Sequence, residues 1–330
     1  MRDFFQLMEA ALDQGDDFAL AIISGIKGSS PQKKGAKAIF YGDGRIDGTL
    51  GGGCLEAEVQ QRARQAIATQ TPEAFELVLD HDFGWDDGLI CGGKVTGLIL
   101  PHAAGMKDLW RHLSKRDREM TWGVRPDFSI QTAERETGDW LYRETVLPPC
   151  ALWIAGAGHV AQAVTPLALK LDFEVSVFDD RPALANHRFF PPETQFQTDY
   201  WENLLGIPLP NRPTFGLIVT RGHQHDARVL RHWLQQPFAF LGMIGSQRKK
   251  RLIFDQFLAE GLATSDQLAR VACPVGLEIL SQSVDEIALS IMAQIVRLRG
   301  EKVYLRQPKL SPSAKAVGPS SVAREEVDLA

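Results

Sequence analysis

The residues best suited to chemistry in this chain begin with Cys54, which directly follows Gly51, Gly52 and Gly53. A helical pattern follows the cysteine, from Leu55 to about residue 69. Glycines let a backbone approach a ligand closely, and a helix N-terminus presents free N–H groups with partial positive charge. Together they predict an anion site that holds Cys54 as a partial thiolate. The alternative is a tight strand-to-helix turn with a buried cysteine.

A loop rich in hydrogen-bond donors precedes this turn. Residues 27–35 include Ser29, Ser30 and Lys33 and no acidic side chain. An apolar strand at 18–26 leads into the loop, and a predicted hairpin follows it. The loop and the Gly-Cys turn therefore bracket one small sheet, where they could face the same anionic ligand.

A second cysteine, Cys91, also lies beside glycines, just before an apolar strand that ends at Leu100. Either cysteine alone is more often structural, but two of them flanked by glycine in one small domain favour a functional interpretation. The four cysteines of the chain are far apart, and none has the spacing to a Cys or His that is typical of zinc. Free thiols in a reducing cytoplasm fit this usage.

The composition is that of an ordinary globular protein, with 44% hydrophobic and 23% charged residues. A net charge of −5 predicts no general attraction to nucleic acid or to an anionic membrane. The sequence shows neither a signal-like N-terminus nor an apolar stretch long enough to span a bilayer. We therefore expect a cytoplasmic protein. Its 330 residues are enough for two domains of ordinary size.

The C-terminal half contains a strand, a glycine loop, a helix and a second strand that ends in an acid. Apolar residues 151–155 run into Gly156, Gly158 and His159, and the second strand ends at Asp179. This order and spacing are typical of a Rossmann half that binds a dinucleotide, with Asp179 on the ribose. His159 would stand where a phosphate binds, or would be an exposed loop histidine.

The strand at 215–220 ends in a second polar cluster, which contains His223, His225 and Asp226. Such a cluster at the carboxyl end of a parallel strand could bind a metal or act as acid and base. The alternative is ordinary loop polarity, with Asp226 capping a helix at 227–235.

The next strand, at 238–244, is followed by Gly245, Ser246 and four consecutive basic residues that begin at Arg248. A glycine, a serine N-cap and a basic first turn favour phosphate binding. The alternative is a solvated basic helix face.

Taken in order, the motifs of both halves resemble the xanthine dehydrogenase accessory protein family (XdhC/CoxI type), and the resemblance covers nearly all of residues 1–300. The motifs that carry it are GSSPQKKGAKAIF, GTLGGGCLEAEV and CGGKVTGLIL, followed by LWIAGAGHVA, FDDRP, TRGHQHD, GMIGSQRKK, CPVGLEI and SVDEIALSIMAQIVRLR.

The resemblance implies a chaperone for the molybdenum cofactor, with no turnover of its own. Such a protein would bind the molybdopterin form, hold it while a cysteine desulfurase installs its terminal sulfur, and pass it to xanthine dehydrogenase. Cofactor-synthesis proteins and a second copy of the chain, as a homodimer, are further expected partners. The metal end of the cofactor would meet Cys54 or Cys91, since thiolates suit metal–sulfur chemistry.

Two alternatives come from the residues themselves. One is an NAD(P)-dependent oxidoreductase that uses Asp179, and the other is a nucleotidyltransferase-like or sulfur-transfer enzyme that uses Cys54. For the cofactor-binding site we expect Ser29, Ser30, Lys33, Gly51, Gly52, Gly53, Cys54, Cys91, Gly156, Gly158, His159, Asp179, His223, His225, Asp226, Gly245, Ser246 and Arg248.

The predicted fold class is α/β. We expect a smaller α/β domain at residues 1–148, in which the segment 120–147 completes the sheet. A Rossmann-like, doubly wound parallel sheet follows at 149–300. The Pro- and Ser-rich tail at 301–330 is expected to be disordered.

Overall fold

The structure of this protein is a computed structural model that describes residues 4–79, 93–133 and 138–301. The described residues fall into two compact units, described separately below. The N-terminal unit contains residues 4–115 and 119–146, and the C-terminal unit contains residues 116–118 and 147–301. The predicted domain bounds stay a prediction, and the predicted tail after Glu301 lies outside the described residues.

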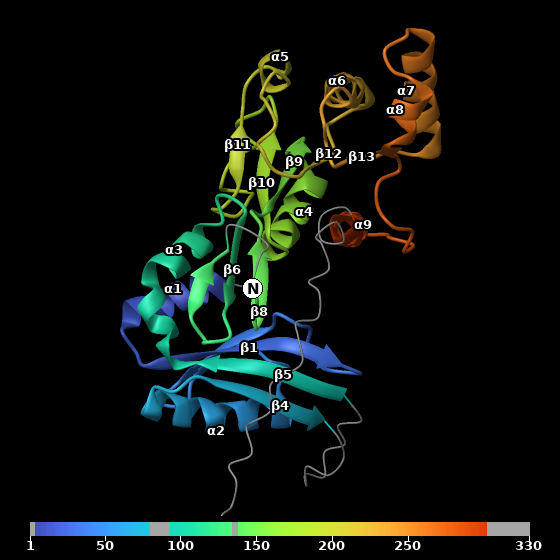
Figure 1. Cartoon of the computed structure of the whole chain (residues 1–330). Coiled ribbons are helices and arrows are strands. Elements are labelled where there is room, and N and C mark those ends of the chain that lie inside the picture. The colour runs from blue at the N-terminus through green and yellow to red at the C-terminus, as the bar shows by residue number, and fades with distance from the viewer. Residues whose placement is uncertain (1–3, 80–92, 134–137, 302–330) are drawn as a thin grey trace, which may run out of the picture. The chain divides into compact units, whose positions relative to one another are not determined.

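The N-terminal unit is built on a five-stranded antiparallel sheet with the order β3-β2-β1-β5-β4. Figure 1 labels β1, β5 and β4, which lie side by side in it. The strands of this sheet are β1 (Phe18–Lys27), β2 (Lys37–Tyr41), β3 (Ile46–Gly48), β4 (Glu73–Leu79) and β5 (Gly93–Leu100). The central strand β1 is apolar along most of its length because both faces of the sheet are covered. Ala19, Ala21 and Ile23 face one core, whereas Leu20 and Ile22 face the other.

One face of this sheet is covered by helix α2 (Gly53–Thr69), which presents Leu55, Val59 and Ala63 to it. The other face is covered by a mixed layer of helices and short strands. This layer contains α1 (Phe4–Gln14), the 3₁₀ helix η1 (Pro101–Met106), α3 (Lys107–Lys115), β6 (Met120–Val124), β7 (Ile130–Thr132) and β8 (Tyr142–Val146).

The prediction that residues 120–147 complete the main sheet is wrong. Strands β6, β7 and β8 pair with one another in a separate antiparallel sheet of order β7-β6-β8. Trp122 of β6 packs edge-on against Trp110 of α3, with ring centroids 5.0 Å apart. The small sheet is therefore held by aromatic packing on the face of the larger sheet, and not by pairing with its edge.

The C-terminal unit is built on a six-stranded sheet with the order β11-β10-β9-β12-β13-β14 (Figure 1). Its strands are β9 (Cys150–Ala155), β10 (Phe173–Phe178), β11 (Gln195–Gln197), β12 (Thr214–Ile218), β13 (Phe240–Met243) and β14 (Val271–Ala272). Each strand of this sheet pairs in parallel with its neighbours.

Helices cover both faces of the parallel sheet, as expected for a doubly wound fold. One core contains apolar side chains of α4 (His159–Lys170) and α9 (Val284–Arg299). The opposite core contains side chains of α5 (Trp201–Leu204), α6 (His223–Trp233), α7 (Gln247–Ala259) and α8 (Ser265–Ala269). The predicted α/β class with a doubly wound parallel sheet is confirmed.

Candidate functional site

The candidate site of the C-terminal unit lies where the strand order of the parallel sheet changes direction. From β9 the chain extends the sheet through β10 to β11, and it then continues on the other side of β9 with β12. The carboxyl ends of the strands at such a switch point are where doubly wound folds bind ligands. The segments after β9, β10, β12 and β13 carry every candidate residue that the sequence indicated in this half.

The loop after β9 contacts the loop after β12 through Gly156. Its φ is +113°, and a Cβ there would lie 2.4 Å from the carbonyl oxygen of Val219 and 2.9 Å from Cα of Thr220. A side chain would force the two loops apart, so the glycine is required by close backbone approach. By contrast, nothing crowds Gly158, which is the N-cap of α4. His159 follows as the first helical residue and is exposed.

Asp179 holds the glycine loop in place. Its carboxylate accepts hydrogen bonds from the backbone N–H of Ala157 at 2.7 Å and from Arg181 through Nε, Nη2 and the backbone N–H, at 2.8 to 3.0 Å. Burial raises the pKa of the Asp179 carboxyl, but the hydrogen bonds from Arg181 and Ala157 outweigh it, so the pKa lies below its usual value. With 1% of the residue exposed, Asp179 acts here as a structural anion.

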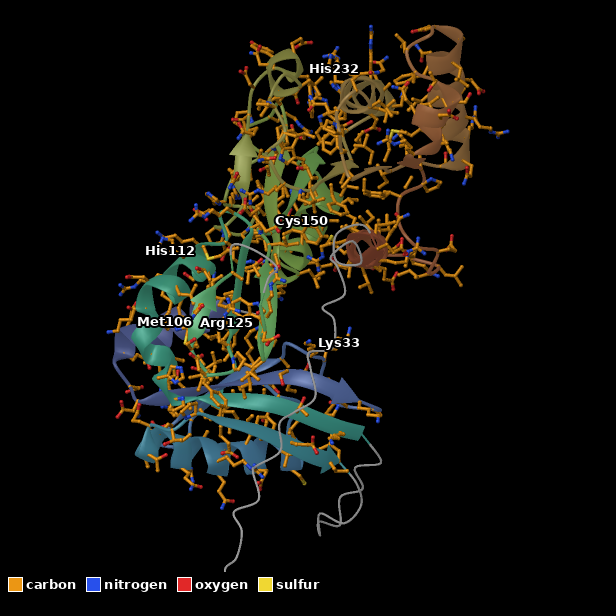
Figure 2. The ribbon with its side chains drawn as sticks, viewed as in Figure 1. Lys33, Met106, His112, Arg125, Cys150 and His232 are labelled. Atoms are coloured by element: carbon orange, nitrogen blue, oxygen red, sulfur yellow. The ribbon has the colours of Figure 1, made fainter. Side chains whose placement is uncertain are left out.

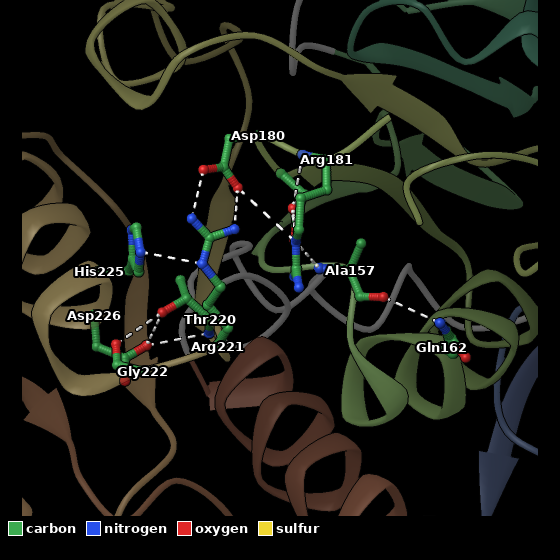
Figure 3. A network of polar contacts seen from close by, with 10 residues as sticks. Ala157, Gln162, Asp180, Arg181, Thr220, Arg221, Gly222, His225 and Asp226 are labelled. Carbon is green, nitrogen blue, oxygen red and sulfur yellow. Dashed lines mark hydrogen bonds and ion pairs between the residues drawn. The ribbon is translucent and has the colours of Figure 1, made fainter. Parts of the chain in front are cut away.

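The neighbouring Asp180 forms a bidentate ion pair with Arg221, in which both Nη–Oδ distances are 2.8 Å (Figure 3). Arg221 also donates through Nε to Nε2 of His225 at 3.2 Å. Nε2 of His225 is the acceptor of this bond, since the Nε–H of a guanidinium can only donate. The three side chains form one chain of contacts from the loop after β10 to the first turn of α6.

The alternative in which Asp226 caps a helix at 227–235 differs from the structure. Helix α6 begins earlier, at His223, and its N-cap is Gly222. Asp226 lies in the first turn, where its carboxylate reaches back to accept hydrogen bonds from the backbone N–H and the hydroxyl of Thr220, at 3.1 and 2.7 Å. It also pairs with the ammonium of Lys249. The buried carboxylate therefore joins the loop after β12 to α7.

His223 and His225 do not converge on one point. His223 is exposed, whereas His225 is half-buried and faces Arg221 (Figure 3). Within the described part of the chain, no three His, Cys, Asp or Glu side chains are grouped so that they could hold a metal ion. The His-x-His-Asp motif therefore supplies hydrogen bonds and one ion pair in this part of the structure.

The start of α7 matches the predicted N-cap. Ser246 precedes the helix, and its hydroxyl accepts a hydrogen bond from the backbone N–H of Lys249 at 3.2 Å. Arg248 is exposed, but the Lys249 side chain turns inward to Asp226 and to the carbonyl of Ile244, 3.0 Å away. The basic run is therefore not one uniform solvated face, because one of its cations belongs to a buried pair.

In the N-terminal unit, the Gly-Cys turn carries an anion of its own, the carboxylate of Glu56. It accepts from the hydroxyl of Thr49 at 2.6 Å and from the backbone N–H of Leu50 at 2.8 Å. Burial raises the pKa of Glu56, but these bonds, with the N–H groups of Gly52 and Gly51, bring it below its usual value. Glu56 thus accepts hydrogen bonds from some of the backbone N–H groups that the sequence pattern predicted to bind a ligand.

Cys54 lies in the first turn of α2 and is half-buried, with a free thiol. Cys91 lies outside the described residues. The two other cysteines of the chain, Cys150 and Cys273, are buried, and burial raises the pKa of both thiols. Among the described cysteines, Cys54 is therefore the one whose thiol solvent can reach.

The loop between β1 and β2, which carries Ser29, Ser30 and Lys33, lies against the Gly-Cys turn. A Cβ on Gly51 would be 2.7 Å from Cγ of Pro31, so these two segments touch. Ser29 lies against Gly93, whose added Cβ would be 1.8 Å from the Ser29 carbonyl oxygen. Ser29 is exposed, and Lys33 is exposed on the same loop between β1 and β2 (Figure 2).

The contacts that Glu56, Asp180, Arg221 and Lys249 make at these sites were not predicted from the sequence. Asp180 and Arg221 both stood in the quoted motifs FDDRP and TRGHQHD, but nothing in their spacing indicates that they meet across 41 residues. For Glu56 a local signal existed, because an acid in the first turn of a helix can bond to free N–H groups before it.

Two family models match the chain. One, described as the XdhC Rossmann domain, matches residues 152–295, and the other, described as the XdhC and CoxI family, matches residues 11–80. No described helix is long and apolar enough to cross a membrane.

Three curated relatives align along most of the chain. A protein of Escherichia coli (strain K12) named Uncharacterized protein YqeB is 28% identical over 87% of this chain, which spans only 44% of that relative. A probable xanthine dehydrogenase subunit of Bacillus subtilis (strain 168) is 27% identical over 91% of this chain and 98% of its own length. Molybdenum cofactor insertion chaperone PaoD of Escherichia coli (strain K12) is 24% identical over 90% of this chain and 88% of its own length.

A solved structure has the same fold. The crystal structure described as a xanthine dehydrogenase from Bacillus halodurans superposes with a TM-score of 0.78 and 24% sequence identity, over 92% of this chain and 98% of that one. The two family models together match well over half of the 330 residues, and relatives that carry the family's subunit and chaperone names align along most of the chain. This chain belongs to the XdhC and CoxI family.

Proposed function

We propose that this protein is a maturation chaperone for the molybdenum cofactor. It binds the molybdopterin form, holds it while its terminal sulfur is installed, and delivers it to an enzyme of the xanthine dehydrogenase class. It performs no turnover of its own. A cysteine desulfurase, the proteins of cofactor synthesis and a second copy of the chain are the partners that this proposal includes, and the cytoplasm is its location.

The alignment with a named cofactor insertion chaperone carries this proposal. PaoD aligns with 90% of this chain and with 88% of its own length, so the match is not confined to the Rossmann domain that many unrelated proteins share. The relative named as a xanthine dehydrogenase subunit aligns equally fully. Together these two relatives support a role in the maturation of a molybdoenzyme.

Each unit, taken by itself, carries side chains that suit a chemical group of such a cargo. Molybdopterin carries a phosphate, and Arg221 and Arg248 lie at the carboxyl edge of the parallel sheet. It also carries a dithiolene that binds molybdenum, and the half-buried thiol of Cys54 is a soft ligand beside a glycine turn. Cys54 is therefore a candidate ligand for the molybdenum, and Cys91, the other predicted cysteine, lies outside the described residues.

The oxidoreductase alternative gains no support from Asp179. In a nicotinamide-binding Rossmann fold, the acid after the second strand accepts from the ribose hydroxyls. Here that carboxylate already accepts four hydrogen bonds from Ala157 and Arg181. A ribose would have to displace these four hydrogen bonds from Asp179, a residue that is only 1% exposed.

Cofactor retention by the purified full-length chain tests the proposal. The chain is incubated with molybdenum-loaded molybdopterin released from a purified molybdoenzyme and is then separated by gel filtration. We expect molybdenum and pterin to co-elute with it in equal amounts, and we expect a parallel titration with NADH or NADPH to show no saturable binding. Saturable nicotinamide binding without pterin retention would favour the oxidoreductase.

The role of Cys54 is tested by Cys54→Ser, compared with Cys150→Ser and Cys91→Ser. Cys150 is 4% exposed, so it serves as a control for loss of a buried thiol. We expect Cys54→Ser to keep the fold but to lower cofactor retention or the activity of the client enzyme per molybdenum inserted. Full client activity with Cys54→Ser would make this a structural cysteine and would direct attention to Cys91.

A further inference from the structure

Three carboxylates take part in acid–base pairs at the carboxyl edge of the parallel sheet, and they differ in exposure. The carboxylates of Asp179 and Asp226 are 1% and 0% exposed, and each holds loops together through several bonds. The third carboxylate is different, because Asp180 is 21% exposed. It pairs with Arg221, which is 41% exposed, and lies 3.9 Å from Nε of Arg181. Asp180 is therefore the carboxylate of the three that a solute can reach, and Arg221 is the most exposed of the paired cations.

The Asp180–Arg221 pair also occupies a particular place in the sheet. Asp180 follows β10 and Arg221 follows β12, while β9 lies between these two strands. A contact between the two loops therefore crosses the carboxyl end of β9 and its glycine loop (Figure 3). This is the crevice in which doubly wound folds place the phosphate groups of their ligands.

The guanidinium of Arg221 is held with its two Nη groups directed at an anion. Its Nε donates to His225 at 3.2 Å, which fixes the plane of the group. The two Nη atoms each donate to one oxygen of Asp180 at 2.8 Å. This fork-to-fork geometry is the one in which arginine binds either a carboxylate or a phosphate.

We propose that Arg221 is the phosphate receptor of this protein and that Asp180 competes with the ligand for it. The ligand class is a phosphate monoester dianion. Binding exchanges the Asp180 carboxylate for the phosphate on the same two Nη groups, and no covalent bond changes. Naming the pterin phosphate as the natural ligand rests on the proposed function, whereas the exchange itself rests on the geometry alone.

The competition predicts opposite signs for the two single substitutions. Asp180→Asn removes a competing anion from an exposed pair and should tighten phosphate binding by about 2- to 5-fold, because exposed pairs are worth little. Arg221→Gln removes the bidentate donor and should weaken binding by roughly 10- to 100-fold. Arg221→Lys keeps the charge without the fork and should fall between Arg221→Gln and the unaltered chain.

The experiment measures the affinity of the full chain for metal-free molybdopterin and, separately, for inorganic phosphate. The matched control is Arg228→Gln, since Arg228 of α6 is, like Arg221, an exposed arginine in an ion pair, here with Glu202. This control should leave both affinities unchanged. Thermal melting of each variant checks that the C-terminal unit is folded.

Weaker binding in Asp180→Asn, to the same degree as in Arg221→Gln, would overturn the competition, because the pair would then act as one structural unit. Unchanged binding in Arg221→Gln would overturn the receptor. The two proposals fail separately. If the chain retains no pterin, but inorganic phosphate gives the predicted order of variants, the receptor stands and the proposed cargo fails. If all variants retain pterin equally, the cargo stands and the receptor fails.

Discussion

The buried pair of Asp226 and Lys249 gives the sharpest test of whether the polar residues after β12 and β13 are structural. Lys249→Met removes the cation and keeps a similar apolar stem. Asp226→Asn removes the anion and keeps the shape. Because both residues lie in motifs that resemble a ligand site, loss of function in either variant has two explanations, which a stability measurement separates.

The structure sets the size of each effect. Lys249→Met leaves a carboxylate of 0% exposure without its countercharge, which costs about 3–5 kcal/mol, here at the lower end because Thr220 still donates two hydrogen bonds to it. Asp226→Asn leaves an ammonium that is 23% exposed and still bonded to the carbonyl of Ile244, so the cost is about 1–3 kcal/mol. The double variant should lose less than the two single losses added together.

Hydrogen exchange read peptide by peptide is the suitable assay, because a chain of two compact units need not unfold in one step. Peptides from β12 and α6 should lose most protection in Lys249→Met, less in Asp226→Asn and least in the control. The control is Arg251→Met, which removes an exposed cation from α7, the helix that carries Lys249. It should lower the stability by less than about 0.5 kcal/mol.

A Lys249→Met variant as stable as Arg251→Met would refute this reasoning. The pair would then contribute nothing to the folded state. If the same variant also lost phosphate binding, Lys249 would return to the basic run as a ligand-binding residue.

Three other charged groups allow comparable tests. Glu56→Gln should destabilise the Gly-Cys turn by about 1–3 kcal/mol. The control Glu58→Gln, on the same helix, should change the stability little. Hydrogen exchange of the α2 amides measures both effects. Lys37→Met should destabilise the N-terminal unit by about 1–3 kcal/mol in urea unfolding, because the buried ammonium lies 2.6 Å from Glu144 and within 6.0 Å of four aromatic rings. For Asp179 the folded pKa lies below the usual 3.8, so its stabilisation is present above that pH and is lost as the pH falls through the folded pKa. The stability difference between the unaltered chain and Asp179→Asn, followed by urea unfolding at a series of pH values, should therefore shrink below about pH 3.8.

The fold of the C-terminal unit could be predicted because its signals are local. The strand, the glycine loop and the helix at Gly156 follow one another within a short stretch, and the cap at Ser246 involves Lys249, only three positions away. Close approach of Gly156 to Val219 then explains why glycine stands there. The sequence indicated the glycine, and the structure identifies the strand end that it contacts.

The pairing of the side chains could not be predicted for the opposite reason. Asp226 meets Lys249 across 23 positions, and Asp180 meets Arg221 across 41. No local pattern encodes such a contact, because it depends on which strands are neighbours in the sheet. The misplaced segment 120–147 has the same origin, since short strands pair with one another or with a larger sheet equally well by pattern alone. The aromatic contacts of this segment favour the separate small sheet, and such contacts are not encoded in a local pattern either.

The charges at the two candidate sites have one feature in common, which bears on the proposed carrier function. At the Gly-Cys turn the backbone N–H groups bind Glu56, and at the parallel sheet Arg221 binds Asp180. An anionic cargo gains at each site only the difference between its own contact and the internal one that it replaces. Such competition lowers affinity without removing specificity, because the donors stay oriented for an anion. In a protein that keeps its cofactor permanently, internal competing anions would only lower the affinity, whereas a protein that transfers its cofactor must release it. The exposed Asp180–Arg221 pair therefore fits a protein that transfers its cargo better than one that retains it.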